Sequence, residues 1–366
     1  MSIITRLANR IFRRQGAAKQ SAALGALWAG ITLVLGSPNP AAAADPALNR
    51  GPSASVVIVQ DPAATDAFRP DRQRVRAMVD KGILKLTGKA TVPEAWRSLV
   101  TTQDVVGLKV FASPGPNSGT RLAVAEAVIQ DLLAAGLPPV NLVVWDRQVV
   151  DLRLSGFYDL ADRYGVRVLG STQVGWDEKT FYEPDSPVIG NLVWGDLEFG
   201  RKGDGVGRKS FLSKLVSKQL TKIINITPLL NHNQAGVSGN LYSLATGSVD
   251  NLIRFETSPD ALATAIPEIY NQPSLSDRVV LNITDALICQ YEGGESSLLH
   301  YATPLNELRF SRDPVALDVL SLDELDRQRR LARAPAVRPN FKLYSNAALL
   351  KLGVSDTRRI QVETVK

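Results

Sequence analysis

The sequence has 366 residues, of which 45% are apolar, 21% are charged and 6% are aromatic. This composition is typical of a globular protein, and the length allows one large domain or two modest ones. The net charge is +6, and five of the positive charges lie within the first 44 residues: Arg6, Arg10, Arg13, Arg14 and Lys19. Without them, 37 basic residues face 36 acidic residues. The folded part therefore lacks the surplus positive charge that a nucleic-acid-binding groove needs.

Residues 1–44 have the order of an export signal peptide. After the basic stretch comes an apolar run from Ala22 to Gly36, and then the small-residue run 41–44. We expect cleavage near Ala43 or Ala44, with an uncleaved N-terminal anchor as the alternative. The Arg13–Arg14 pair leaves the general and the twin-arginine export routes both open. No later segment has the roughly 20 apolar residues of a membrane span, so the product is expected in the periplasm or cell envelope.

Cys289 is the only cysteine in the sequence, which also has only two histidines. An intrachain disulfide is thereby excluded, and no cysteine-ligated iron–sulfur cluster or zinc site is expected, because both need several such ligands. In the apolar run "ALICQY", Cys289 is expected to be a small buried hydrophobic residue.

Apolar runs alternate with helical patterns after the signal. Six runs predict buried strands: Ala54–Asp61, Val105–Ser113, Asn141–Arg147, Gly165–Ser171, Thr221–Pro228 and Asp277–Leu287. Three segments predict helices: Arg121–Gly136, Ser210–Leu220 and Pro314–Arg330, the last with Asp313 as its N-cap. This alternation predicts that residues 45–366 form one layered α/β/α domain, Rossmann-like in architecture, with a mainly parallel sheet.

Polar and glycine-rich stretches follow four of these strands. They are "SPGPNSGT" from Ser113, the Asp146–Arg147 pair, "PLLNHNQAGVSG" from Pro228, and Asp285 with the nearby "CQYEGG". Ligands of open parallel sheets bind beyond the carboxyl ends of the strands. If the strands are parallel, these four loops share one edge of the sheet and form a ligand site there.

The same stretches resemble a family of bacterial and archaeal proteins, domain of unknown function 362. The resemblance rests on "VVGLKVFASPGPNSGTRLAVAEAVIQDLLAAGL", "NLVVWDR", "PLLNHNQAGVSGNL", "LNITDALICQYEGG", "FSRDPVALDVLSLDELD" and "LYSNAALLKLGVSDTRRIQVE", in that order. It covers most of the chain between residues 105 and 365. It implies an α/β fold and a site near His232, and it implies no particular reaction.

This sequence departs from that family in two ways. Relatives often carry a lysine-rich "PKLKTH" in the stretch before the histidine, where Leu230 and Asn231 stand here, and Tyr242 replaces another common lysine. An anion-binding role tied to those lysines does not carry over. Some relatives are also fused to cysteine-rich, ferredoxin-like segments, and this chain has none.

Three residues are candidates for catalysis. His232 has an imidazole that either acts as a general base, ligates a metal, or is simply hydrogen-bonded within its loop. Asp146 and Asp285 stand at predicted strand ends, where they either share acid and base roles or cap the next turn. A divalent metal held by His232 and Asp285 is one form of this hypothesis.

The candidate substrate-binding residues surround these three. Arg147 either clamps an anionic group or pairs with a surface acid. Lys109, within its strand, points either into the cleft or to solvent. The loop of Asn117, Ser118, Gly119 and Thr120 either cradles an anion at a helix N-terminus or is an ordinary capping loop. The last candidates are the two side-chain amides beside His232, those of Asn231 and Asn233.

The leading hypothesis is an exported α/β enzyme that acts on a small anionic molecule at the carboxyl ends of the strands, with the reaction unassigned. The alternative is a non-catalytic periplasmic binding protein that uses the same cleft. A cell-envelope scaffold is a third reading, although no repeat supports it.

Overall fold

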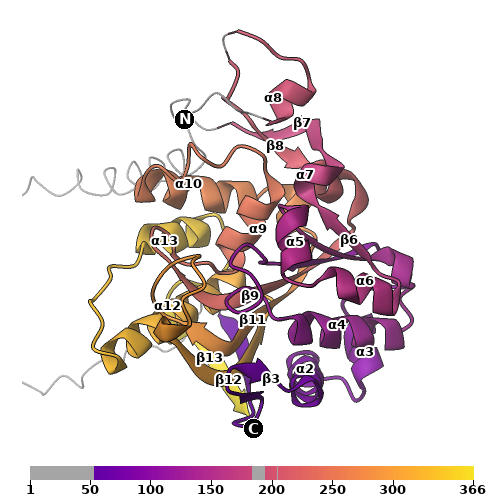
Figure 1. Ribbon diagram of the computed structural model, residues 1–366, viewed down its shortest axis with the longest axis vertical. Coiled ribbons are helices and arrows are strands. Elements are labelled where there is room, and N and C mark those ends of the chain that lie inside the picture. The colour runs from indigo at the N-terminus through magenta and orange to yellow at the C-terminus, as the bar shows by residue number, and fades with distance from the viewer. Residues whose placement is uncertain (1–52, 184–193, 204) are drawn as a thin grey trace, which may run out of the picture.

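The computed structural model describes residues 53–183, 194–203 and 205–366 (Figure 1). The predicted export segment, residues 1–44, lies outside the described residues. Within them, no helix combines the length and the apolar character needed to cross a membrane.

A mostly parallel sheet forms the centre of the fold. Its strands are β1 (Ala54–Gln60), β4 (Val106–Val110), β5 (Leu142–Asp146), β6 (Arg167–Gly170), β9 (Lys222–His232), β10 (Gly236–Val237), β11 (Val279–Gln290), β12 (Ala302–Ser311) and β13 (Ile360–Val365). The order is β13-β1-β12-β11-β9-β4-β5-β6, with β10 paired to β9. Strands β11, β9, β4, β5 and β6 are parallel, whereas β12 is antiparallel to both neighbours.

Helices cover both faces of this sheet (Figure 1). One face carries α2 (Arg72–Thr87), α3 (Val92–Arg97), α4 (Leu122–Ala134), α5 (Val149–Leu154) and α6 (Tyr158–Tyr164). The other carries α9 (Asn240–Ser248), α10 (Pro259–Tyr270), α12 (Pro314–Leu331) and α13 (Phe341–Leu349). Alternate strand residues enter the two apolar cores, as Val144 and Trp145 of β5 do. The predicted layered α/β fold is confirmed.

Short elements complete the described chain. The strands are β2 (Thr65–Asp66), β3 (Arg69–Pro70), β7 (Trp176–Tyr182) and β8 (Ser210–Ser213), and the helices are α7 (Ser171–Val174), α8 (Trp194–Glu198) and α11 (Pro273–Ser276). Single helical turns cover Pro139–Asn141, Leu215–Gln219, Leu299–Tyr301 and Thr357–Arg359. Strands β7 and β8 pair in a separate two-stranded sheet.

Local sequence explains the helix boundaries. The Asp313 carboxylate accepts the backbone N–H of Ala316, and Pro314 occupies the first turn of α12, as expected. Helix α2 begins in the same way at Asp71 and ends at Gly88, whose φ of 66° suits glycine.

Two predictions of secondary structure were wrong: one helix, and the ends of two strands. Residues 210–220 do not form one helix, because Phe211 and Leu212 are fully buried in β8, and only a π-helical turn follows. Strand β9 continues past its predicted end at Pro228 to His232, and β11 continues past its predicted end at Leu287 to Gln290. Both extensions are buried, so tertiary packing keeps them extended where the sequence indicated loops.

The strand order brings four of the predicted loops together. Because β11, β9, β4 and β5 are neighbours and parallel, their carboxyl ends lie along one edge of the sheet. We call this the carboxyl edge. The opposite one, where β1 begins and antiparallel β12 ends, is the amino edge.

Two aspartates meet where α2 packs against α4. Asp131 on α4 is buried, and the indole N–H of Trp96 donates to its Oδ2 at 3.2 Å. Burial, followed by the repulsion and hydrogen bond of Asp80 on α2, raises the pKa of Asp131 to about 7. The folded state therefore favours the protonated carboxyl.

Asp131 makes the stability of the fold depend on pH near neutrality. Because its folded pKa lies above the unfolded one, its stabilising contribution is full at acidic pH and is lost as pH rises through about 7. We expect the wild type to lose about 1 kcal/mol between pH 6 and pH 8 at this site, and Asp131→Asn, which cannot ionise, to lose less. Urea unfolding at both pH values measures this. An equal loss in both proteins contradicts the assignment.

Candidate functional site

A cavity of about 210 Å³ opens at the carboxyl edge, beside the ends of β4 and β5. Its lining comes from the loops after β4, β5 and β11 and from α9: Phe111, Ser113, Asp146, Arg147, Gln148, Asp151, Tyr242, Thr246, Gly247, Leu252, Glu256 and Glu295. We call it the carboxyl-edge cavity. Segments far apart in the sequence thus meet at the edge where the sequence predicted a ligand site.

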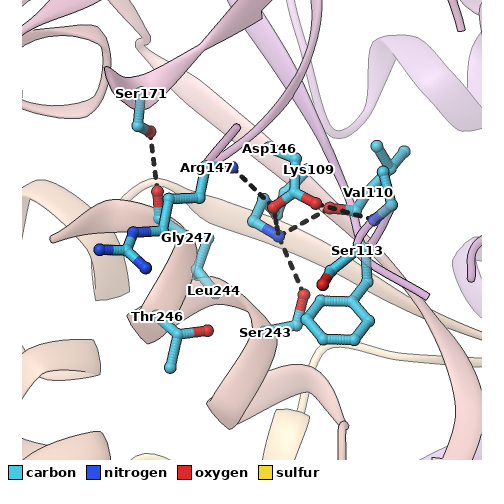
Figure 2. Close-up of polar contacts among 12 residues, drawn as sticks. Lys109, Val110, Ser113, Asp146, Arg147, Ser171, Ser243, Leu244, Thr246 and Gly247 are labelled. Carbon is cyan, nitrogen blue, oxygen red and sulfur yellow. Dashed lines mark hydrogen bonds and ion pairs between the residues drawn. The ribbon is translucent and has the colours of Figure 1, made fainter. Parts of the chain in front are cut away.

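Asp146 of the cavity lining forms a buried ion pair with Lys109 (Figure 2). Lys109 is 0% exposed, and its Nζ lies 2.8 Å from Oδ1 of Asp146. The same ammonium donates to the Val110 carbonyl at 2.7 Å and to the Ser243 hydroxyl at 3.0 Å, so all three of its donors are used. Burial lowers the pKa of Lys109, and the Asp146 carboxylate opposes that shift.

Asp146 is held rigidly by its neighbours. Besides Lys109, its Oδ1 accepts the backbone N–H of Arg147 at 2.8 Å, and its Oδ2 accepts that of Ala112 at 2.7 Å. A carboxylate offers about four acceptor positions, so roughly one remains for a ligand in the cavity. Asp146 is therefore suited to orienting a donor group rather than to exchanging protons.

Gly247 provides the space that Lys109 occupies. A Cβ atom at Gly247 would stand 2.2 Å from Cε of Lys109, which no real contact permits. The Gly247 carbonyl also accepts the Ser171 hydroxyl at 2.7 Å, as Figure 2 shows. A glycine near the end of α9 thus lets the lysine chain pass between the helix and the sheet.

Carboxylates dominate the charge of the cavity lining. Asp146, Asp151, Glu256 and Glu295 line it in the described part of the chain, against the single guanidinium of Arg147. Burial, and then the charge of Glu256, raises the pKa of Glu295, while a 3.3 Å hydrogen bond from Ser113 opposes the shift. Burial, and then the charge of Asp146, also raises the pKa of Asp151. The cavity concentrates negative charge, and its members repel one another.

The guanidinium of Arg147 and the hydroxyl of Tyr242 are hydrogen-bond donors in the same lining. Arg147 donates through Nη2 to the Asp250 carbonyl, and its buried Nε has no hydrogen-bond partner among the described residues. The Tyr242 hydroxyl donates to Glu256 at 3.0 Å, and burial raises the pKa of that phenol. Tyr242 is thus a neutral donor, and the Nε of Arg147 is a buried donor without a partner among the described residues.

His232 lies beside the cavity rather than in its lining. Its Nδ1 accepts the backbone N–H groups of Gln234 (3.2 Å) and Ala235 (3.0 Å), and its ring centroid lies 4.2 Å from that of Tyr242. Burial lowers the pKa of His232 to about 4. At neutral pH the imidazole is therefore uncharged, with its proton on Nε2, and it stabilises the turn after β9.

Asp285 is a structural residue inside the sheet. Its carboxylate accepts the backbone N–H of Arg121 at 2.9 Å and lies 3.2 Å from the Arg121 guanidinium, with no exposed surface. It pairs with Pro228 in register, four residues before His232 on β9, which corresponds to roughly 13 Å along a strand.

The expected grouping of His232, Asp146 and Asp285 does not form: Asp146 lines the cavity, His232 lies beside it, and Asp285 is buried inside the sheet. Nowhere in the described ranges do three or more histidine, cysteine, aspartate or glutamate residues come together to hold a metal ion.

Residues 117–120 of the predicted anion-cradle loop tie strands together instead of lining the cavity. Thr120 donates to the Ile226 carbonyl at 2.7 Å and accepts the Phe111 N–H, and Ser118 donates to Gln290 at 2.6 Å. The Asn117 carbonyl accepts Arg121 at 3.3 Å. A Cβ at Gly119 would stand 2.6 Å from the Phe111 carbonyl, so only glycine fits there.

The loop that carries Glu295 is fixed by residues that the sequence assigned to substrate binding. Asn231 accepts the Gly294 N–H at 2.9 Å, and its amide contacts Asn233 at 3.4 Å. Gln290 donates to three carbonyls of the same loop: Glu292, Gly294 and Ser296. Asn231 therefore positions the loop that carries Glu295, one of the four acids that line the cavity.

Sequence reasoning missed seven lining residues with polar side chains: Ser113, Gln148, Asp151, Tyr242, Thr246, Glu256 and Glu295. Glu295 had a usable signal, because it lies within three residues of "CQYEGG", which follows a predicted strand. Glu256 and Tyr242 reach the cavity through folding of distant segments, and no local pattern marks them.

Comparison with known proteins does not identify the chain. No protein-family model matches the sequence, and no curated protein matches it. A crystal structure of a Thermotoga maritima protein is similar to 74% of this chain, with 10% sequence identity and a TM-score of 0.40. The matched region spans 61% of that protein's length. A similarity at this level supports no conclusion about function.

Removing Lys109 tests the ion pair. Because Lys109→Met leaves the buried Asp146 carboxylate without its cation, we expect a loss of about 3–5 kcal/mol in the free energy of unfolding. Lys109→Met combined with Asp146→Leu should recover part of that loss. Lys85→Met, which breaks the exposed pair with Glu363, is the matched control and should change little. Urea denaturation measures all three. A Lys109→Met protein as stable as the control contradicts a structural role for the pair.

Proposed function

We propose that this chain is an exported α/β protein that binds a small, positively charged molecule in the carboxyl-edge cavity and acts on it as an enzyme. The observation that carries this proposal is the charge of the lining. Four carboxylates line the cavity in the described part of the chain, against the guanidinium of Arg147 and the ammonium of Lys109, which pairs with Asp146. A buried cluster of acids favours a cationic group, since the cation relieves their mutual repulsion. This ligand has the opposite charge to the anion expected from the sequence.

The proposed ligand is small. A volume of about 210 Å³ is below the roughly 300–1,000 Å³ of pockets for drug-sized ligands. Short primary amines and guanidinium compounds fit this size and charge. Asp146 and Glu256 would accept their N–H groups, and the apolar side chains of Phe111 and Leu252 would contact a short carbon chain.

Glu295 is the proposed proton-transfer residue. A raised pKa brings a carboxyl group closer to the pH at which it gives and takes protons readily. Asp146 would orient the ligand, because its hydrogen bonds hold it in place. The reaction itself is unassigned.

A non-catalytic binding protein is the second candidate. The three contacts that hold Asp146 in place favour it, since a fixed acceptor provides affinity and orientation without chemistry. Membership of the domain of unknown function 362 family, supported by the order of the sequence motifs, is part of the same proposal and is compatible with either candidate.

The ligand's charge is tested by calorimetric titration with propylammonium and guanidinium, and with propionate as the anion of matched size. We expect the cations to bind and Glu295→Gln to weaken their binding about tenfold, as the loss of one charge-assisted contact would. Affinity should fall as pH decreases and Glu295 becomes protonated, and the variant should lose that dependence.

Glu94→Gln, an exposed change on α3, is the matched control and should leave binding unchanged. Tighter binding of propionate than of the cations would overturn the proposed ligand class, and unchanged binding by Glu295→Gln would remove Glu295 from the site.

The proposed export and cleavage of the N-terminal segment are tested separately. Expressed in a Gram-negative host, the full sequence should appear in the periplasm with a mature N-terminus at Ala44 or Asp45, as read by intact mass and N-terminal sequencing. Replacing Arg13 and Arg14 with lysine should block export if the twin-arginine route is used, and leave it intact if the general route is used. An uncleaved chain in the membrane fraction would instead establish an N-terminal anchor.

A further inference from the structure

A second and larger cavity lies at the amino edge of the sheet, away from the proposed site. Its volume is about 700 Å³, within the range of small-molecule pockets. It is lined by the start of β1, the end of β12, and residues of α2, α13 and the segment after α13: Ser53, Ala54, Ser55, Leu86, Ser311, Arg312, Asp313, Ala348, Lys351, Leu352, Gly353 and Val354. We call it the amino-edge cavity.

The walls of this cavity are held in place by one aspartate. Asp313 caps α12 through Oδ1 and accepts the Val354 N–H through Oδ2 at 2.8 Å. A Cβ at Gly353 would stand 1.9 Å from Oδ1 of Asp313, so this glycine allows the wall segment to lie directly against the cap. The connection between α12 and the segment after α13 thereby preforms the cavity.

The lining combines an apolar surface with positive charge. Leu86, Leu352 and Val354 contribute aliphatic side chains, and Arg312 and Lys351 contribute the cations. Neither cation makes a side-chain hydrogen bond or ion pair with any residue that the structure describes. The carboxylate of Asp313 already accepts backbone N–H groups through both oxygens. Two cations, both exposed to solvent, thus face one carboxylate, and the net charge of the lining is positive.

We propose that the amino-edge cavity binds an aliphatic carboxylate, with its hydrocarbon chain against Leu86, Leu352 and Val354 and its carboxylate between Arg312 and Lys351. Burying the chain supplies the hydrophobic contribution, and the two cations fix the polar end through charge-assisted hydrogen bonds. The lining of the carboxyl-edge cavity has the opposite charge, so the two cavities select different ligands.

Calorimetric titration of the purified protein with decanoate tests this site. Acetate is the probe without a chain, and decyltrimethylammonium is the probe with the charge reversed. We expect saturable 1:1 binding of decanoate and much weaker binding of the other two. Replacing Arg312 and Lys351 with glutamine should weaken decanoate binding at least about tenfold. The paired change Arg333→Gln and Arg338→Gln removes the same charge from exposed residues outside the cavity and should leave the affinity unchanged.

Two further variants test where the decanoate chain binds and whether its binding is independent of the carboxyl-edge cavity. Ala348→Phe, which fills part of the cavity, should reduce decanoate binding if the chain lies there, with thermal unfolding used to verify that the variant is folded. Glu295→Gln should bind decanoate normally, so failure of the proposed carboxyl-edge function leaves this result intact. Three results would overturn the proposal: no saturable decanoate binding, equal binding of decyltrimethylammonium, or equal losses in the two glutamine pairs.

Discussion

The ion pair between Lys109 and Asp146 is the interaction on which the carboxyl edge depends. Removing both charges from water is costly, and only a short contact with full hydrogen bonding compensates for that cost. The structure meets this condition, because the ammonium uses its three donors and the carboxylate accepts from three groups. The pair joins β4 to β5, and the Ser243 hydroxyl joins both to α9. Helix α9 is thereby held where Tyr242 and Thr246 face the cavity.

The acids of the cavity depend on this arrangement. The four carboxylates in this small space repel one another, and the charges of Lys109 and Arg147 offset part of that repulsion. The loop bearing Glu295 is in turn held by Asn231 and Gln290. Several residues that sequence patterns assigned to ligand contact therefore support the residues that line the cavity. Support of this kind is what keeps a site preorganised.

The two edges of the sheet differ because the strand directions differ. At the carboxyl edge, four acids come together from three segments: the end of β5 with the following α5, the segment after α9, and the loop after β11. At the amino edge, the end of antiparallel β12 continues directly into α12 through Arg312 and Asp313. That connection places a helix cap and a free cation next to the first residues of β1. One sheet thus carries two cavities of opposite charge at its opposite edges.

The sequence by itself determined the α/β class, the six predicted strands, the capping of α12 and the edge where polar loops gather. These features depend on local patterns of apolar residues, caps and glycines, which neighbouring residues largely decide. Tertiary structure alone decided which residues line the cavity. Asp285 is buried against Arg121 inside the sheet. The Nδ1 of His232 accepts N–H groups of the turn after β9, because packing extends β9 beyond its predicted end. Glu256, Glu295 and Tyr242 meet Asp146 only after the chain has folded, since the side chains of a ligand site converge through space rather than along the sequence.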